Sequence, residues 1–265
     1  MVLTSIKNPW IKQLRKLRSR SYRHQQNLCL LEGTHLLERA CDLNYPLEAV
    51  CATPDWIERY GKLWQQVQTQ AQRVEIVTPT VLEAIATTVN PDGVIATLPR
   101  SCLQRPFKQP VSLTIALERL QDPGNLGTIL RAAAATSASG LWLSEDSVDL
   151  DNPKVLRASA GEALRFPVAI CSDVGSAIAQ SQAQGLQVVA TLPQASLTYW
   201  DVDWTKPSLI VLGNEGAGLS PELIAMSDIQ TQIPLSAGVE SLNVAIAAAL
   251  LLYEAQRQKM GFFGQ

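Results

Sequence analysis

The chain has 265 residues, 46% of them hydrophobic, and a formal net charge of −2 at pH 7. This length and hydrophobic content are enough for a large buried core in one domain or two. No apolar run reaches the length of a membrane span, and Lys7, Lys12 and Arg15 interrupt the apolar run that a secretory signal would need, so we expect a cytoplasmic protein.

The N-terminal region is strongly basic. Residues 1–31 contain seven Lys and Arg and no acidic residue, which leaves the rest of the chain with a net charge of −9. Residues 8–17 predict a helix that Asn8 caps and Pro9 begins, because apolar side chains recur there at helical spacing. Its basic face suits either nucleic-acid phosphates or plain solvent. The candidate RNA contacts are Lys7, Lys12, Arg15 and Arg23.

Residues 30–98 have the pattern of a small α/β domain. The predicted elements are helices over 36–43 and 56–70 and strands over 48–52, 74–77 and 93–98. Pro99, Pro106 and Pro110 then break all periodicity, as in a linker. The predicted organisation is a domain over residues 1–98, a linker over 99–110 and a second domain over 111–265.

In the second domain, short β-type runs alternate with helical stretches. This alternation favours a parallel sheet covered by helices, in which ligands bind beyond the carboxyl ends of the strands. The predicted strands are 111–118, 140–144, 186–192, 209–213 and 230–235, and the predicted helices are 126–136, 174–184 and 244–258. We therefore expect the functional residues on the loops that follow the strands.

Cysteine and histidine usage limits the chemistry. The five cysteines are odd in number and never form a C-x-x-C pair, so we expect buried reduced thiols rather than disulfides, and no metal site. Both histidines, His24 and His35, lie near the N-terminus, which excludes a Ser-His or Cys-His hydrolase site further along the chain.

The first of three notable loops spans residues 122–131. A Pro-Gly turn ends a strand there, and a helix is predicted to begin near Asn125 or Leu126. A helix N-terminus directs N–H groups outward and suits an RNA phosphate, and Arg131 lies about one and a half turns further on. An ordinary strand-turn-helix junction capped by Asn125 is the alternative.

The second and third loops span residues 209–222 and 233–243. The second has three glycines within six residues around one carboxylate, Glu215, so a ligand can approach the backbone closely, although helix capping at Ser220 explains part of it. It matches neither a Rossmann dinucleotide motif nor a P-loop. In the third, Ser241 and Asn243 can bind a ligand or cap the helix that follows, whose apolar residues predict burial in a core or a subunit interface.

Together the loops carry D-P-G-N-x-G-x-x-x-R, G-N-E-G-x-G-L and I-P-L…E-S-L-N-V-A in that order. Over about residues 111–258 the chain therefore resembles the SpoU (TrmH) branch of the SPOUT RNA methyltransferases. The first 98 residues more loosely resemble the L30e-like RNA-binding domain that precedes many such enzymes, through S-x-x-N-P-x-x-K-x-L at residues 5–14 and the pair Glu32-Gly33.

The resemblance implies an α/β SPOUT fold with a parallel sheet and a deep trefoil knot, a homodimer, and transfer of a methyl group from S-adenosylmethionine to a ribose 2′-hydroxyl of RNA. The catalytic positions it implies are Asn125, Arg131, Glu215, Ser241 and Asn243. The cofactor positions it implies are Thr191, Leu192, Leu212, Gly213, Gly218, Ile233, Leu235 and Leu242.

Methyl transfer from a sulfonium to a hydroxyl needs an in-line approach and removal of a proton, and it requires no metal. Because a guanidinium keeps its proton in proteins, we prefer Arg131 as a clamp on the phosphate beside the target ribose, with Glu215 and Asn125 orienting the site. Glu240 adds a carboxylate to which no role is assigned.

Two alternatives stay open. The chain could be a catalytically inactive RNA-binding or ribosome-assembly protein on the same fold, or a small-molecule methyltransferase, which would not need residues 1–98. For the RNA enzyme, the L30e-like domain favours ribosomal RNA over tRNA as the substrate.

Overall fold

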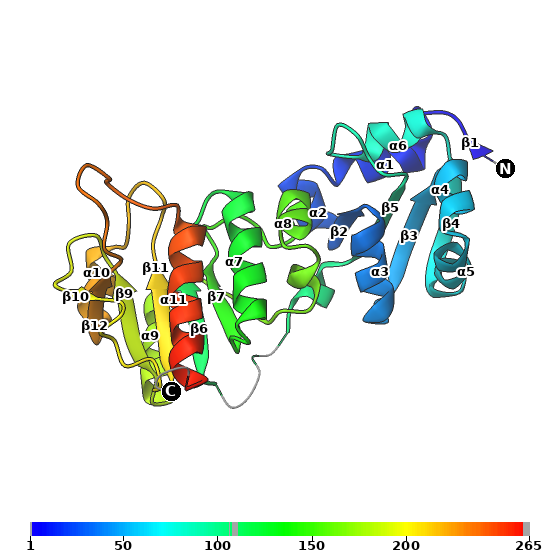
Figure 1. Cartoon of the computed structure of the whole chain (residues 1–265). Helices are drawn as coiled ribbons and strands as arrows, with labels where there is room; N and C mark the ends of the chain where they lie inside the picture. Colours follow the sequence, from blue (N-terminus) through cyan, green and yellow to red (C-terminus); the bar gives the residue numbers. More distant parts are fainter. Residues whose placement is uncertain (1, 106, 108–110, 262–265) are drawn as a thin grey trace. The chain divides into compact units, whose positions relative to one another are not determined.

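The computed structural model describes residues 2–105, 107 and 111–261 (Figure 1). The chain divides into two compact units, Met1–Gln104 with Asp149–Arg165 and Arg105–Val148 with Phe166–Gln265, here called unit 1 and unit 2. Residues 149–165, which the sequence pattern groups with the second domain, therefore pack in unit 1. No helix within the described residues is long and apolar enough to cross a membrane.

Unit 1 is built on a five-stranded mixed sheet in the order β1-β4-β3-β5-β2. The strands are β1 (Val2–Leu3), β2 (Leu28–Glu32), β3 (Leu47–Ala52), β4 (Ala71–Val77) and β5 (Val94–Pro99). The helices are α1 (Pro9–Lys16), α2 (Arg20–Gln26), α3 (Thr34–Asp42), α4 (Pro54–Arg59), α5 (Gly61–Gln70), α6 (Pro79–Ile85) and α8 (Pro153–Ala158), with short 3₁₀ turns η1 (Arg100–Leu103) and η2 (Glu162–Leu164).

The N-terminal helix is confirmed. The Asn8 side chain accepts a hydrogen bond from the backbone N–H of Trp10 at 2.9 Å, and the apolar face of α1 is buried at Ile11 and Leu14. The single helix predicted over 56–70 is wrong, because the chain leaves the helical conformation at Tyr60 (φ −119°, ψ 41°) and so divides into α4 and α5.

Charged side chains hold residues 149–165 within unit 1. Arg23 is only 2% exposed, and its guanidinium lies 3.3 Å from a carboxylate oxygen of Asp149 and 3.3 Å from one of Asp151. Arg157 of α8 lies 3.0 Å from the buried carboxylate of Glu32. Removing one partner of such a buried pair leaves an uncompensated charge and costs about 3–5 kcal/mol of stability. Arg23 therefore holds the fold together rather than presenting its charge at the surface.

Unit 2 contains the predicted parallel sheet, in the order β10-β12-β9-β11-β6-β7-β8, and every pairing in it is parallel. The strands are β6 (Leu113–Leu117), β7 (Gly140–Ser144), β8 (Val168–Cys171), β9 (Gln187–Thr191), β10 (Leu197–Thr198), β11 (Ser208–Leu212) and β12 (Ile229–Gln232). The helices are α7 (Pro123–Ala135), α9 (Val174–Ala183), α10 (Pro221–Met226) and α11 (Val244–Lys259).

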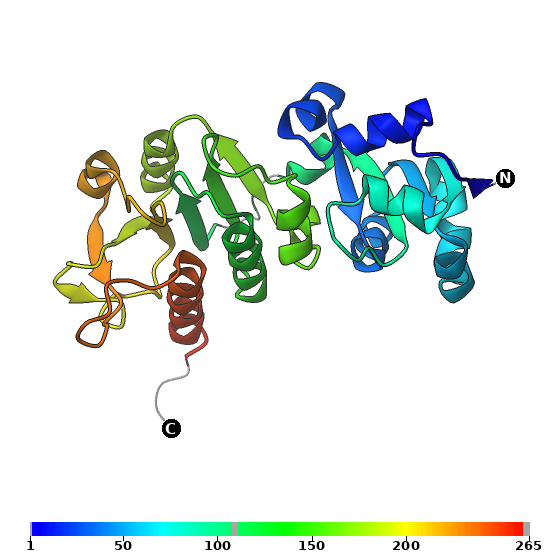
Figure 2. The same ribbon diagram turned by 90° about the horizontal axis from the view of Figure 1, so that it is seen from above.

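Helices cover both faces of this sheet. Figures 1 and 2 show α7 and α11 side by side on one face, with α9 and α10 on the other. All residues of β6 and β11 are buried, which explains why both strands are continuous apolar runs rather than alternating ones. The carboxyl ends of these central strands lead directly into the first and second loops singled out in the sequence. The trefoil knot stays a prediction of the family resemblance.

Candidate active site

The three loops meet at the carboxyl edge of the parallel sheet. Asn125, at the start of α7, donates a hydrogen bond from its side-chain amide to the carboxylate of Glu215 at 3.0 Å. The Asn243 amide in turn donates to the Asn125 side-chain oxygen at 2.9 Å. A single chain of hydrogen bonds, Asn243 to Asn125 to Glu215, therefore joins one residue from each loop.

The first loop differs from its prediction. Helix α7 begins at Pro123 rather than near Asn125 or Leu126, because Asp122 is the N-cap. The Asp122 carboxylate accepts hydrogen bonds from the backbone N–H groups of Gly124 at 2.6 Å and Asn125 at 3.0 Å. Since these amides are already satisfied, the contacts favour the capping alternative, with Asp122 rather than Asn125 as the cap, and a phosphate at this helix N-terminus stays a prediction.

Arg131 is placed to make an external contact. It is exposed on α7, and its guanidinium forms no ion pair or hydrogen bond within the described residues. Arg119, in contrast, lies 3.2 Å from the Glu118 carboxylate. An exposed guanidinium on the helix that begins with the first loop is suited to an anion that arrives with a ligand.

Glu215 is held as an ionised carboxylate. Besides the Asn125 amide, the backbone N–H groups of Gln121 and Asp122 donate to it, each at 3.2 Å. Its partial burial favours a higher pKa, but the hydrogen bonds outweigh burial and lower the pKa below its ordinary value. A carboxylate with a lowered pKa is a weak proton acceptor, so the geometry gives Glu215 a positioning role.

The second loop folds back on itself through glycine. Asn214 and Gly218 exchange two backbone hydrogen bonds at 3.1 and 3.0 Å, and the Asn214 side-chain oxygen accepts from the N–H groups of Gly216 and Ala217. A Cβ atom on Gly213 would lie 2.2 Å from the Gly218 carbonyl carbon, and Gly218 itself has a φ of +70°. Both positions therefore require glycine, for close approach and for backbone conformation respectively.

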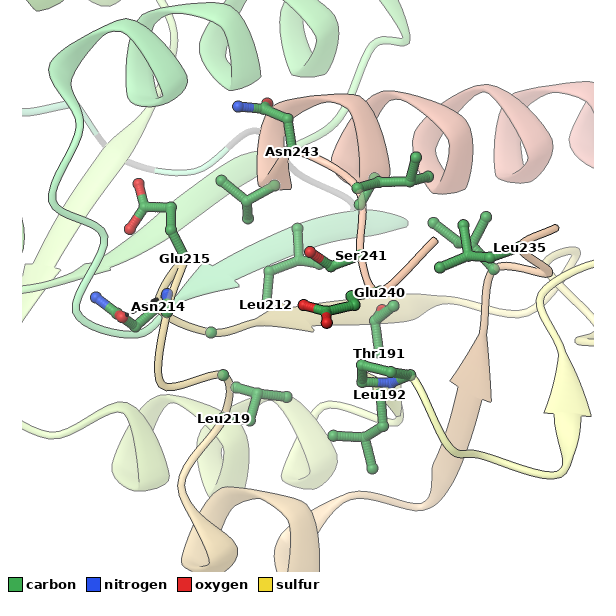
Figure 3. A pocket seen from close by; sticks show the side chains of 18 residues that line it. Thr191, Leu192, Leu212, Asn214, Glu215, Leu219, Leu235, Glu240, Ser241 and Asn243 are labelled. Atoms are coloured by element: carbon green, nitrogen blue, oxygen red, sulfur yellow. Dashed lines mark hydrogen bonds between the residues drawn. The ribbon is translucent and has the colours of Figure 1, made fainter. Parts of the chain in front are cut away.

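A cavity of about 510 Å³ opens beside this turn (Figure 3). This volume is within the range of cofactor pockets. Every position at which we expected a cofactor contact lines it, namely Thr191, Leu192, Leu212, Gly213, Gly218, Ile233, Leu235 and Leu242. Glu215, Ser241 and Asn243 also line it, whereas Asn125 and Arg131 do not.

Residues 112–253 match the SpoU rRNA methylase family, and residues 8–96 match the MRM3-like substrate-binding domain. The first match covers more than half of the chain. The chain belongs to the SpoU family. The predicted α/β SPOUT fold is confirmed by the same comparisons, because solved structures with this fold superpose on nearly the whole chain.

Three similar proteins illustrate the relationship of this SpoU protein to others. An uncharacterised tRNA/rRNA methyltransferase of Synechocystis is 45% identical over 97% of this chain and 94% of its own length. The 23S rRNA (guanosine(2553)-2′-O)-methyltransferase of Bacillus subtilis is 28% identical over 95% and 97%. The crystal structure of an AdoMet-bound rRNA methyltransferase from Sinorhizobium meliloti is 31% identical over 97% of both chains, with a TM-score of 0.86.

The cavity of this SpoU protein has a distinct charge. Its titratable lining residues are the carboxylates Glu215 and Glu240, and none of the described lining residues is Lys, Arg or His. The Thr191 hydroxyl oxygen is buried and has no hydrogen-bond partner among the described residues. The cavity thus suits a ligand that carries positive charge and a hydrogen-bonding group.

Some site residues were missing from the sequence analysis. Asp122 and Asn214 organise the first two loops, and their signal was local, because Asp and Asn commonly accept backbone hydrogen bonds two and three residues ahead. Of the predicted RNA contacts in the SpoU protein, Lys7, Lys12 and Arg15 are exposed in unit 1. Arg23 is buried in its ion pairs, and we therefore propose no RNA contact for it.

None of the five cysteines forms a disulfide, in agreement with the expectation of reduced thiols. Cys29, Cys41 and Cys51 are buried, and Cys102 and Cys171 are partly buried. Burial raises the pKa of Cys51 to about 12 and those of Cys41 and Cys171 to about 11. These thiols are protonated at neutral pH and are poor nucleophiles.

Proposed function

We propose that this SpoU-family protein is a cytoplasmic enzyme that transfers the methyl group of S-adenosylmethionine to a ribose 2′-hydroxyl of ribosomal RNA. The observation that carries the proposal is the hydrogen-bonded chain of Asn243, Asn125 and Glu215 at the edge of the 510 Å³ cavity. This hydrogen-bonded chain joins one residue from each of the three family loops, and two of them, Glu215 and Asn243, line a pocket of cofactor size.

The lining residues fit S-adenosylmethionine, which supplies an activated methyl group on a sulfonium. The turn at Gly213 and Gly218 leaves the main chain accessible to a ligand. The two lining carboxylates complement a positively charged cofactor, and the unpartnered Thr191 hydroxyl can form a hydrogen bond with it.

The polar residues of the site have separate tasks in this proposal. Arg131 holds the phosphate beside the target ribose, because its guanidinium is exposed and keeps its charge. The ionised Glu215 fixes Asn125. The Asn243 side-chain oxygen caps α11 through the N–H of Ala245 at 2.9 Å, which leaves its amide to orient Asn125. Ser241 lines the cavity at the same junction.

We propose ribosomal RNA rather than tRNA as the substrate because the chain has unit 1 in addition to the SpoU domain. The Bacillus subtilis enzyme, whose name gives a 23S rRNA substrate, aligns with both units rather than with the SpoU domain alone. Unit 1 also carries the exposed cations Lys7, Lys12 and Arg15, which suit an extended RNA backbone.

The test uses radiolabelled S-adenosylmethionine with ribosomal RNA and tRNA from cells that lack the gene. We expect label in ribosomal RNA, at one nucleotide that becomes resistant to alkaline cleavage. Label in tRNA alone would contradict the choice of substrate. Cofactor binding without transfer to either RNA would support the alternative of a non-catalytic RNA-binding protein.

A homodimer is the second part of the proposal. On α11, Ile246, Leu250 and Tyr253 are 53%, 37% and 53% exposed and follow one another at helical spacing, although the opposite side of the helix is packed in the core. An apolar stripe of this kind on a helix is typical of a subunit interface.

Replacing Leu250 by lysine is expected to shift the protein from dimer to monomer, because a buried charge in the interface has no partner. Light scattering after size-exclusion chromatography gives the mass. The matched control is Gln65→Lys on the exposed side of α5, which should leave the mass unchanged. A wild-type protein that is monomeric at micromolar concentration would contradict the dimer.

A further inference from the structure

Unit 1 contains a cleft that the proposed chemistry does not use. Its volume is about 170 Å³, and it lies between α1, α2 and the sheet. The floor is a cross-strand row in which Thr97 of β5 pairs with Ala49 of β3, and Ala49 pairs with Arg73 of β4. Trp10 of α1 and Tyr22 of α2 line its walls.

The cleft presents aromatic rings beside one lining cation, Arg73, and one lining carboxylate, Glu48. The Arg73 guanidinium carbon lies 3.8 Å from the centre of the Trp10 ring, and the Glu75 carboxylate holds the guanidinium at 2.7 Å. The Lys16 ammonium lies 5.5 Å from the centre of the Tyr22 ring. Aromatic rings and stacked guanidinium planes are the surfaces on which proteins stack single-stranded bases.

The floor of the cleft holds an unsatisfied hydroxyl. Thr97 is 1% exposed, and its hydroxyl oxygen has no hydrogen-bond partner among the described residues. Among the buried hydroxyls without a partner in the described residues, those of Thr97 and Thr191 belong to residues that line a cavity, where a ligand can satisfy them. The amides of Gln13 and Gln26 also line the cleft and offer donors and acceptors of the kind that read base edges.

We propose that this cleft binds one unstacked base of the RNA substrate, with the base against Trp10 or Tyr22 and a polar edge on Thr97. Lys16, which is exposed on α1 and lies 5.5 Å from the centre of the Tyr22 ring, would hold the adjacent phosphate. Unit 1 would supply the contacts to the base, to its flat face and to the phosphate. The cleft would therefore let this unit distinguish one base from another, in addition to attracting RNA by charge. The inference rests on the proposed function, since it takes the RNA substrate as the ligand.

The test is Thr97→Val, which removes the hydroxyl and keeps the shape of the side chain. The matched control is Thr114→Val on β6, where a second threonine is 1% exposed and its hydroxyl also lacks a partner among the described residues. For the full-length protein and deproteinised 23S ribosomal RNA, Thr97→Val is expected to raise Kd about threefold to tenfold, the effect of one lost hydrogen bond. Thr114→Val should leave Kd unchanged, and neither variant should lower Tm.

A second variant tests the stacking surface. Tyr22→Ala is expected to raise Kd about tenfold, because it removes one face on which a base can stack. Ultraviolet crosslinking of the wild-type protein to the same RNA should yield adducts on the peptides that contain Trp10 or Tyr22.

Equal Kd values for Thr97→Val and Thr114→Val would overturn the base site, as would crosslinks confined to other peptides. A different result would contradict the proposed function: the wild-type protein would bind the RNA but transfer no methyl group to it. Even then, the Kd values of Thr97→Val and Thr114→Val would still show whether the cleft binds a base.

Discussion

Replacing Arg131 by alanine is expected to lower kcat/KM for ribosomal RNA about a hundredfold, the effect of losing one charge-assisted contact to phosphate. The side chain is exposed, does not line the cofactor cavity and has no partner among the described residues. The affinity for S-adenosylmethionine should therefore stay unchanged. Steady-state methyl transfer at varied RNA concentration, with isothermal titration of the cofactor, measures both quantities.

The control is Lys206→Ala. Lys206 lies just before β11, at the edge of the sheet opposite the three loops, and pairs with Asp203 at 3.6 Å. Removing this cation should leave kcat/KM nearly unchanged, because surface ion pairs contribute little. If Arg131→Lys bound RNA normally, lost turnover and regained it at higher pH, the clamp role would be wrong and a general-base role would replace it.

Replacing Gly213 by alanine is expected to weaken S-adenosylmethionine binding at least about a hundredfold. The new Cβ would lie 2.2 Å from the Gly218 carbonyl carbon. Because the atoms in its way belong to the backbone and cannot rotate aside as a side chain could, the turn must open. The opened turn no longer presents its main chain to the cavity that Gly213 and Gly218 line. Isothermal titration gives the affinity, and Tm shows whether the fold survives.

Gly216→Ala is the matched control in the same turn. A Cβ atom on Gly216 would lie 3.6 Å from the Asn214 side-chain oxygen, an ordinary contact. We expect a change in affinity much smaller than that of Gly213→Ala. If Gly213→Ala bound the cofactor within threefold of wild type, the close approach of residues 213 and 218 would have no functional importance.

Much of the site could be predicted because its signals are local. The turn glycines, the strand that ends at Leu212 and the apolar start of α11 are short-range patterns, and they predicted the parallel sheet and the loops. The resemblance to the SpoU family, carried by the motifs in those loops, implied the residues that line the cavity. The start of α7 was placed too late because Asn125 and Asp122 are both good caps, and only the contacts show that Asp122 accepts the hydrogen bonds of the first turn.

Charge was less predictable than position. The sequence shows that the first 31 residues are basic, but not which cations face solvent. Arg23 is buried because Asp149 and Asp151, far along the chain, supply its counter-charges. These ion pairs also help to hold residues 149–165 in unit 1, although the pattern of strands and helices groups those residues with the second domain.

The sequence by itself determined that this protein has three ligand-facing loops on a parallel sheet and, through their motifs, the SpoU family. The tertiary structure alone decided how the loops act together. Asn125 reaches Glu215 across 90 residues and Asn243 across 118, and no local periodicity encodes such contacts. Only the folded chain shows that Glu215 is an ionised support for Asn125, that Arg131 is exposed, and that the Thr97 hydroxyl lacks a partner within the described residues.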